Sequence, residues 1–198
     1  LDLGCLGEVQ KEFDKGRKLG YSITAFMEKK SLLLCAPVNY DVKYSINPWM
    51  SPNTPLDKGL AMAQWISLYA TLDRITSVTI RAIDVVKAPK DLPDLVFTAN
   101  AGLVYKNSVV LSNFRHPERR PEKGFYREWF TKNGYQVHEL PDNFYFEGGG
   151  DCFIDGDTLL GGYGFRTQLQ SLKYVAYILG LDLLPLKLSD PRFYHLDT

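Results

Sequence analysis

The sequence lacks an excess of charge of either sign. Its 23 lysine and arginine residues balance its 23 aspartate and glutamate residues, so the formal net charge is zero. A balanced chain offers no strongly basic surface for nucleic acid or for an anionic membrane. It also lacks any apolar run near the roughly 18 residues that a membrane span needs, and no signal peptide is visible. We therefore expect neither nucleic acid nor a membrane as a partner.

Cysteine is also scarce. The three cysteines, Cys5, Cys35 and Cys152, are odd in number and show no metal-ligand spacing. This argues against a disulfide scaffold and favours reduced thiols. We expect a cytoplasmic protein, with the mitochondrial matrix left open. We expect no metal and no cofactor, because the sequence also lacks a dinucleotide or phosphate-binding glycine pattern.

The length sets the number of domains. The 198 residues, 45% of them hydrophobic, can bury the core of one domain. Residues 1–30 are polar and mixed, and we interpret them as an N-terminal extension, either a peripheral helix or a tail. Residues 31–198 are expected to form part of a single α/β domain. Because the first residue is Leu1, we expect a processed or incomplete N-terminus.

A strand–strand–helix–strand unit recurs in the second half of the chain. Turn residues at 106–107 and 155–156 predict hairpins, and Gly134 and Gly180 predict helix ends. The predicted hairpins cover 101–111 and 150–160, the helices 118–132 and 168–179, and the closing strands 135–140 and 181–188. Residues 32–86, with a strand at their start and a helix beginning near Thr54-Pro55, fit the same plan more loosely. The sequence therefore predicts about three ββαβ units.

Three such units do not obviously close into a ring. Sheets arranged around an axis leave exposed edges until the ring is complete, and exposed edges favour aggregation. We expect the chain to be part of a longer protein whose C-terminal part is missing here. The alternative is a partner chain that supplies the rest, as in a homo-oligomer.

Three aromatic-polar stretches, about fifty residues apart, can be superposed on one another. They are 97–100, 146–149 and 194–197. Around a common axis they would bring Glu147, His195 and Asp197 together. Because Asp197 follows His195 by two residues, we expect both side chains on one face of a strand. A histidine between acids suits general acid–base chemistry, whereas a lone histidine would more simply pack at the start of a strand.

Two arginines are candidates for holding a substrate carboxylate, because guanidinium groups bind carboxylates through two parallel hydrogen bonds. Arg166 follows a glycine-rich stretch and is the better candidate. Arg119 lies in a charged run that could simply be solvated, and Arg115 is its main rival.

Cys152 directly follows an acid, but it falls in a predicted strand where a small apolar residue is expected. We therefore do not expect Cys152 to be a nucleophile.

Together these motifs resemble the guanidine-modifying enzymes of the pentein superfamily. That superfamily includes arginine deiminases, dimethylarginine dimethylaminohydrolases, arginine dihydrolases and amidinotransferases, and the arginine dihydrolase-like members are the most similar in motif. The resemblance covers residues 32–198 and rests on 47–50 (NPWM), 94–100 (DLVFTAN), 117–120 (PERR), 147–151 (EGGGD), 164–167 (GFRT) and 195–198 (HLDT).

The resemblance implies a fold, an activity and a set of roles. It implies a pentein-like α/β-propeller of five ββαβ units around a pseudo-fivefold axis, here incomplete. The implied roles are Glu147 and His195 for catalysis, Asn100 and Asp197 for the guanidinium group, Arg119 and Arg166 for the α-carboxylate, and Asn47 and Asp94 for lining the pocket. It further implies a covalent thiouronium intermediate on a cysteine that lies beyond Thr198, so that the isolated chain should be inactive.

One departure from the family pattern bears on the product. Many relatives carry an aspartate where this sequence has Asn100, and an amide, unlike a carboxylate, can donate as well as accept hydrogen bonds. We hypothesise that Asn100 retains a ureido intermediate, so that arginine is converted to ornithine, ammonia and carbon dioxide. The alternatives left open are a non-catalytic pentein-like binding module and an amidinotransferase.

Overall fold

The computed structural model describes residues 30–75, 78–83 and 90–198. The predicted N-terminal extension lies outside these residues except for Lys30. The chain divides into two compact units, residues 1–32 with 67–81, and residues 33–66 with 82–198. The strands that begin in the first unit, β1 (Lys30–Leu34) and β2 (Val78–Ala82), form a two-stranded sheet, and helix α2 (Lys58–Asp73) lies between them in the sequence.

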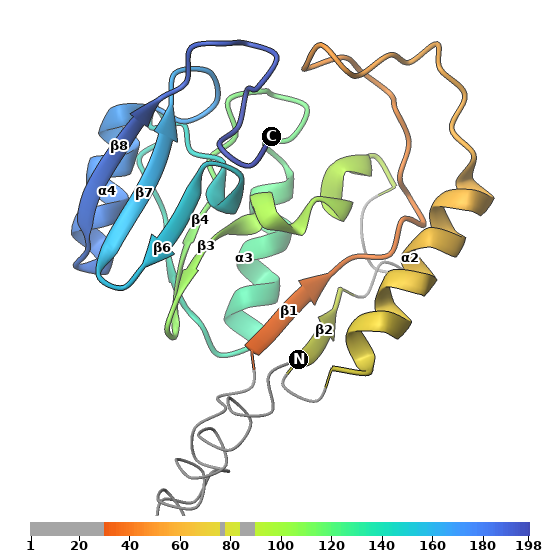
Figure 1. Cartoon of the computed structure of the whole chain (residues 1–198), viewed down its shortest axis with the longest axis horizontal. Helices are drawn as coiled ribbons and strands as arrows, with labels where there is room; N and C mark the ends of the chain where they lie inside the picture. The colour runs from red at the N-terminus through yellow and green to blue at the C-terminus, as the bar shows by residue number, and fades with distance from the viewer. Residues whose placement is uncertain (1–29, 76–77, 84–89) are drawn as a thin grey trace, which may run out of the picture. The chain divides into compact units, whose positions relative to one another are not determined.

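The second unit contains the predicted repeat (Figure 1). Its first copy is β3 (Gly102–Tyr105), β4 (Ser108–Leu111), α3 (Glu122–Lys132) and β5 (Gln136–His138), and its second copy is β6 (Cys152–Asp155), β7 (Thr158–Tyr163), α4 (Leu169–Leu179) and β8 (Asp182–Lys187). In each copy the first two strands are antiparallel, and the third is parallel to the second. The α/β class and the ββαβ order are therefore confirmed for these two copies. Residues 30–75 carry one strand before the helix instead of two.

Several predicted boundaries are shifted by a few residues. Helix α3 begins four residues later than expected because Pro121 stands directly before it. A proline ring clashes with the carbonyl four residues earlier and donates no hydrogen bond. Helix α2 is capped by the Asp57 carboxylate, which accepts the Leu60 N–H at 2.9 Å, and not by Thr54. The second hairpin turns at residues 156–157, one residue later than expected.

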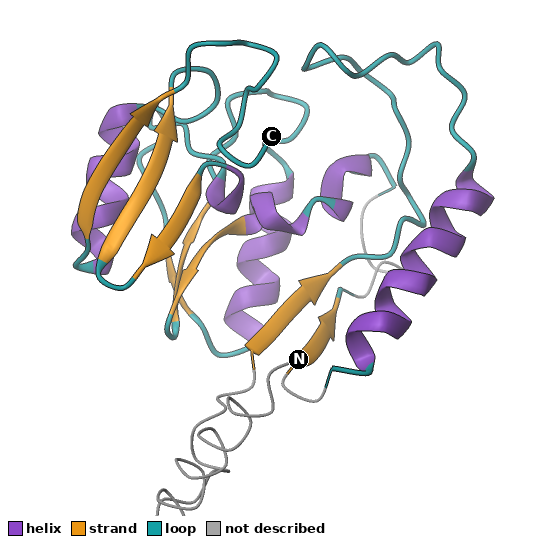
Figure 2. Ribbon diagram, viewed as in Figure 1, coloured by secondary structure: helices purple, strands orange, loops and turns teal. Residues whose placement is uncertain are grey.

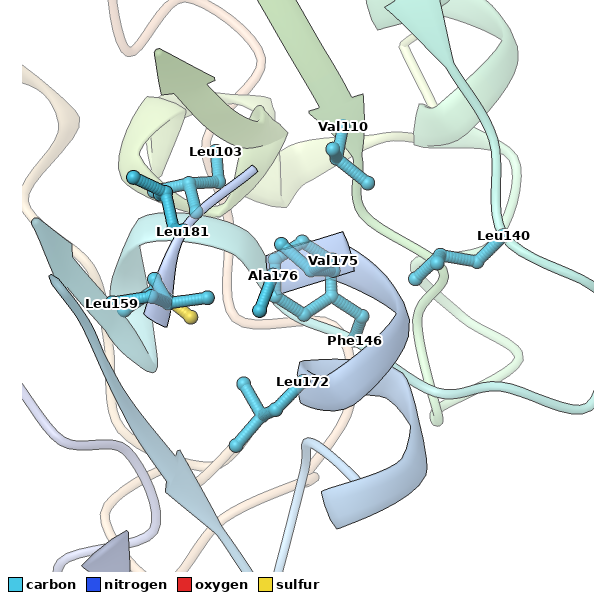
Figure 3. Packing of buried hydrophobic residues seen from close by; sticks show 10 residues of the cluster. Leu103, Val110, Leu140, Phe146, Leu159, Leu172, Val175, Ala176 and Leu181 are labelled. Atoms are coloured by element: carbon cyan, nitrogen blue, oxygen red, sulfur yellow. The ribbon is translucent and has the colours of Figure 1, made fainter. Parts of the chain in front are cut away.

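Helix α4 packs against both three-stranded sheets. Leu172 and Val175 of the helix share one buried cluster with Leu159 of β7 and with Leu103 and Val110 of the preceding copy. Figure 3 shows these side chains converging on one core. Because the helix joins the two copies, the connections at the ends of their strands are held at fixed positions.

Helix α3 makes a second core on the other side of the first copy. Tyr126 and Phe130 are buried there with Leu95, Val109 and Leu111. The Tyr126 hydroxyl donates to the Leu95 carbonyl at 3.0 Å. This bond fixes the 3₁₀ turn η2 (Pro93–Val96), which carries one of the predicted pocket residues. In the described ranges, no helix is both long enough and apolar enough to cross a bilayer.

The core around α4 generates a stability prediction. Leu172 is completely buried, so Leu172→Ala should lower the free energy of unfolding by about 2–5 kcal/mol through lost contacts and a cavity. Leu184 is 49% exposed, and Leu184→Ala should cost less than about 1 kcal/mol. Urea denaturation of both variants measures the difference. Equal losses would show that α4 does not pack as described.

Candidate active site

The predicted site residues lie in loops and 3₁₀ turns, outside the strands. Figure 2 shows the loops that connect the strands and helices. Turn η2 carries Asp94, η3 (Thr98–Ala101) carries Asn100, and η4 (Gly148–Gly150) directly follows Glu147. Arg119 precedes α3, Arg166 precedes α4, and His195 follows β8. Residues distant in the sequence therefore meet because their connections belong to adjacent repeats.

Glycine in η4 makes this meeting possible. Gly148 has a φ of 61°, and a Cβ atom there would lie 2.9 Å from the backbone of Gly102. A Cβ atom on Gly150 would lie 2.4 Å from Nδ2 of Asn100 and 3.2 Å from Nδ1 of His195. Such distances leave no room for a side chain. The glycines allow η4 to lie directly against η3 and the histidine.

Glu147 is the buried centre of the site. Its side chain has no exposed surface, and Oε2 accepts a hydrogen bond from Nη1 of Arg166 at 2.9 Å and lies 2.8 Å from Nε2 of His195. Its backbone N–H donates to Oγ1 of Thr167 at 3.0 Å. Burial disfavours the charged form, but the hydrogen bond with His195 and the charge of Arg166 outweigh it and lower the pKa of Glu147 to about 2. Glu147 is therefore a permanent anion at neutral pH.

Arg166 is held on three sides. Besides Glu147, it donates from Nη2 to the Ile46 carbonyl at 2.8 Å, and its guanidinium group lies 4.6 Å from the centre of the Tyr194 ring. A guanidinium stacked on an aromatic face and bonded at its edge has a defined orientation. The Ile46 contact also ties the loop that carries Asn47 to the site.

Arg119 is held by a second carboxylate. Its Nε and Nη2 atoms donate to the two carboxylate oxygens of Glu122 at 2.8 and 2.9 Å, in a buried bidentate pair. Burial alone would lower the pKa of Arg119, but the hydrogen bonds and charge of Glu122 raise it overall. Nη1 donates to Oδ1 of Asn100 at 3.2 Å, and Nδ2 of Asn100 donates to the Glu147 carbonyl at 3.1 Å. Arg119 and Glu147 are thus joined through one amide.

These groups surround a cavity of about 320 Å³, within the range of roughly 300–1,000 Å³ typical of small-molecule sites. Its lining includes every predicted site residue except Glu147, namely Asn47, Asp94, Asn100, Arg119, Arg166, His195 and Asp197. Glu147 is fully buried and contacts the lining residues His195 and Arg166. The structure therefore brings the whole predicted set together, and the role of each residue stays a prediction.

The expectation that His195 and Asp197 share a strand face is wrong. Both lie in the turn that follows β8. His195 is buried, whereas Asp197 is exposed, and the Asp197 N–H donates to the Gly150 carbonyl at 3.1 Å. A turn can present both side chains to the cavity without strand alternation. Although Asp197 is exposed, partial desolvation of its carboxylate raises its pKa, and the charge of His195 opposes that rise.

The structure also identifies residues that the sequence reasoning did not assign. Glu122 anchors Arg119, Tyr194 stacks on Arg166, and Asp151 is fully buried beside the histidine turn. Arg119 and Glu122 lie three residues apart where a helix begins, and this spacing was a usable signal for an ion pair. Nothing in the sequence marks Asp151 as buried.

The remaining candidates do not contribute to this cavity. Cys152 lies in the core cluster around α4 with 3% exposure, and burial raises the pKa of its thiol, which disfavours the thiolate that a nucleophile needs. Burial likewise raises the pKa of Cys35 to about 12. Arg115 is exposed and donates to the Phe165 carbonyl, so Arg119 is the arginine that lines the cavity. Over the described part of the chain, no cluster of three metal-ligating side chains occurs.

Comparison with known proteins identifies relatives over most of the chain. Residues 51–196 match the profile of the family described as N,N dimethylarginine dimethylhydrolase, eukaryotic. The bifunctional arginine dihydrolase/ornithine cyclodeaminase AgrE of Nostoc is 49% identical over 169 residues, which is 84% of this chain and 23% of that protein. The dimethylarginine dimethylaminohydrolase of Mycobacterium tuberculosis is 40% identical over 162 residues, 82% of this chain and 52% of that protein. The chain therefore spans about a quarter of the AgrE sequence and half of the second relative.

Solved structures agree with these matches. The N-terminal domain of the cyanobacterial arginine dihydrolase ArgZ, a cysteine variant bound to its substrate, has a TM-score of 0.76 at 42% identity, with coverage of 84% of this chain and 61% of that one. A cysteine variant of AgrE with L-arginine has a TM-score of 0.78 at 47% identity, covering 85% and 25% of the two chains. A dimethylarginine dimethylaminohydrolase at 19% identity, with a TM-score of 0.66, shares the fold.

The close approach of η4 generates a prediction at Gly150. Gly150→Ala should lower the free energy of unfolding by about 1–3 kcal/mol, because the added methyl group meets Asn100 and His195. Gly124, inside α3, has no atom within 4 Å of the position of an added Cβ. Gly124→Ala should be neutral or stabilising by up to about 1 kcal/mol. Chemical denaturation of both variants decides; a neutral Gly150→Ala would contradict the described packing.

The buried anion generates a pH prediction. Glu147→Gln should cost about 3 kcal/mol at neutral pH, because it leaves Arg166 without its charged partner. The pKa of Glu147 is lowered from 4.5 to about 2 in the folded chain. The stabilisation of the fold by the Glu147 carboxylate is therefore complete above about pH 5 and is lost as the pH falls towards 2. The stability difference between wild type and variant should shrink over that window, as measured by urea denaturation.

Glu128 provides the control for this change. It lies on the surface of α3 with a 65% exposed side chain, so Glu128→Gln should cost under about 1 kcal/mol at every pH. A Glu147→Gln difference that stayed constant from pH 6 to pH 2.5 would show that Glu147 is not held as an anion.

Proposed function

Because this chain belongs to the N,N-dimethylarginine dimethylhydrolase family, we propose that it forms part of a hydrolase acting on the guanidino group of arginine or of a related compound. The whole protein would carry five ββαβ units around a pseudo-fivefold axis, of which residues 31–198 supply about three. The rest of the protein would supply a cysteine nucleophile. The similarity to AgrE and ArgZ favours an arginine dihydrolase reaction. The cytoplasmic location and any oligomeric partner stay predictions.

The observation that carries this proposal is the buried contact of Glu147 with both Arg166 and His195 beside a small-molecule-sized cavity. A histidine fixed at 2.8 Å from an anion has a defined ring orientation, as a general acid–base catalyst requires. Two arginines in the lining suit a carboxylate, and the acids Asp94 and Asp197 suit a cationic group. A ligand with both charges, as in an amino acid with a guanidino side chain, matches this lining.

The proposed chemistry proceeds in two steps at the central guanidinium carbon. The cysteine thiolate forms a C–S bond, and the C–N bond breaks as His195 gives a proton to the departing amine. Water then attacks the thiouronium carbon while His195 takes a proton from it, and the thiolate leaves. The carboxylates orient the planar cation throughout. The product of one round is a ureido compound.

Asn100 would permit a second round on that product. Its Oδ1 atom accepts from Arg119 and one Nδ2 hydrogen points to the Glu147 carbonyl, which leaves a second amide hydrogen for a ureido carbonyl. A second water would then hydrolyse the retained ureido group and break both C–N bonds of its carbon, so that a further ammonia, carbon dioxide and ornithine would be released. The names of AgrE, ArgZ and the Mycobacterium tuberculosis enzyme each include a hydrolase activity, which favours hydrolysis over an amidinotransferase or a non-catalytic binding module.

Product analysis of the longer protein that contains this chain tests the proposal. With L-arginine it should release ornithine and ammonia, and Asn100→Asp should shift the product towards citrulline. Asn133→Asp, a change on the exposed end of α3, is the control and should leave the products unchanged. Citrulline without ornithine from the wild type would overturn the dihydrolase assignment. N,N-dimethylarginine assayed in parallel shows whether methylated substrates are preferred.

A further inference from the structure

The position of His195 depends on the backbone of a turn. The histidine lies after β8, outside any helix or strand, so no ladder of backbone hydrogen bonds holds it. Two N–H groups of the turn instead donate to the segment that follows Glu147. The Leu196 N–H donates to Oδ1 of Asp151 at 3.2 Å, and the Asp197 N–H donates to the Gly150 carbonyl at 3.1 Å. One of these two anchors is a side chain.

Asp151 is itself rigidly placed. Its side chain has no exposed surface. Its backbone N–H donates to the Gly148 carbonyl at 3.2 Å, and its own carbonyl accepts the Gly162 N–H of β7 at 2.8 Å. Because the backbone of Asp151 is bonded to both η4 and β7, its carboxylate can hold the turn that carries His195 at a fixed position relative to β7.

Gly162 of β7 leaves room for the contact between Leu196 and Asp151. A Cβ atom on Gly162 would lie 3.0 Å from Cβ of Leu196 and 3.4 Å from Oδ1 of Asp151. The missing side chain at Gly162 therefore leaves the space in which Leu196 and the carboxylate meet. The close approach to Gly162 and the hydrogen bond to Asp151 together define one position for Leu196, the residue after the histidine.

We propose that Asp151 is a positioning residue for His195: by accepting the Leu196 N–H, its carboxylate fixes the turn so that Nε2 of the histidine reaches Glu147. The geometric part of this inference is independent of the proposed reaction. Its consequence for catalysis rests on the proposed function, in which His195 transfers the protons.

The charges around Asp151 give the contact a measurable signature. Burial raises the pKa of Asp151 to about 6, the charge of His195 and the hydrogen bond from the Leu196 N–H lower it, and the charge of Glu147 raises it. An ionised carboxylate is a stronger acceptor than a protonated one. The hydrogen bond to Leu196 should therefore strengthen as the pH rises through the Asp151 midpoint.

Nuclear magnetic resonance on the wild-type chain tests the contact without any turnover. The carboxyl carbon of Asp151 should titrate near pH 6, and the Leu196 amide proton should move downfield with the same midpoint. The amide of Asp197 donates to a backbone carbonyl and is the internal control; it should follow this midpoint to a smaller extent. If the chemical shift of the Leu196 amide proton does not change with the Asp151 midpoint, the proposal is overturned.

Variants separate the hydrogen bond from the charge. Asp151→Ala should speed hydrogen exchange at the Leu196 amide by about tenfold or more, because a bond to a charged acceptor is lost. Asp151→Asn keeps an acceptor and should stay within about threefold of wild type, while the midpoint near pH 6 disappears. Asp155→Ala, in the exposed hairpin, should change neither. If Asp151→Ala does not fold, Asp151→Asn alone decides. Loss of hydrogen-exchange protection at the Leu196 amide in Asp151→Asn would overturn the proposal.

The longer protein adds a catalytic readout. Asp151→Ala should lower kcat about tenfold or more with little change in KM, because it displaces a proton-transferring group and leaves the binding residues in place. Asp151→Asn should restore most of the loss. A defect in KM alone would contradict a positioning role. An inactive wild type would refute the proposed function while the resonance measurements still decide the role of Asp151.

Discussion

The contact of the Glu147 carboxylate with Arg166 and His195 is the interaction on which the rest of the site depends. A carboxylate with no exposed surface is costly unless charges and hydrogen bonds compensate it. Here the compensating groups come from two other connections of the chain, one before α4 and one after β8. The need to compensate one buried anion therefore fixes the relative positions of three segments. A rearrangement that removed Arg166 would leave the buried anion without its positively charged partner, and one that removed His195 would take away one of its hydrogen bonds, so the observed arrangement is favoured.

The two hydrophobic cores supply the rigidity that this arrangement needs. Helix α4 buries residues of both sheets in one cluster, and α3 fixes η2 through Tyr126. The connections that carry Glu147 and Arg166 begin and end in elements of the two repeats. Within the connections, precision comes from close approach, since Gly150 leaves Asn100 and His195 nearly in contact with the backbone. Apolar packing thus positions the helices and sheets of the repeats. The close glycine contacts and the ion pairs then fix the positions of the polar side chains.

Much of this was accessible from the sequence, because the repeat places polar residues at equivalent points. Glu147 and His195 follow an aromatic residue at matching places, and turn residues marked both hairpins. The failures have local causes. Pro121 delayed the start of α3, and a turn replaced the strand expected around His195. Glu122 and Asp151 went unassigned because an acidic residue looks the same in sequence whether it is solvated or buried, and only the packing around it decides.

Asn100 shows how the arrangement constrains the identity of a residue. Hydrogen bonds run without a break from Glu122 through Arg119 and Asn100 to the Glu147 backbone, while the Glu147 side chain continues to Arg166 and His195. The residue in the middle must accept from a guanidinium on one side and donate to a carbonyl on the other. An amide does both, whereas an ionised carboxylate would set a negative oxygen against that carbonyl. The amide is therefore favoured by the protein's own network as well as by a ureido ligand. A substitution of Asn100 changes both the hydrogen-bond network between the arginines and the contact with the ligand. A shift in product from Asn100→Asp is therefore read together with the change in the free energy of unfolding.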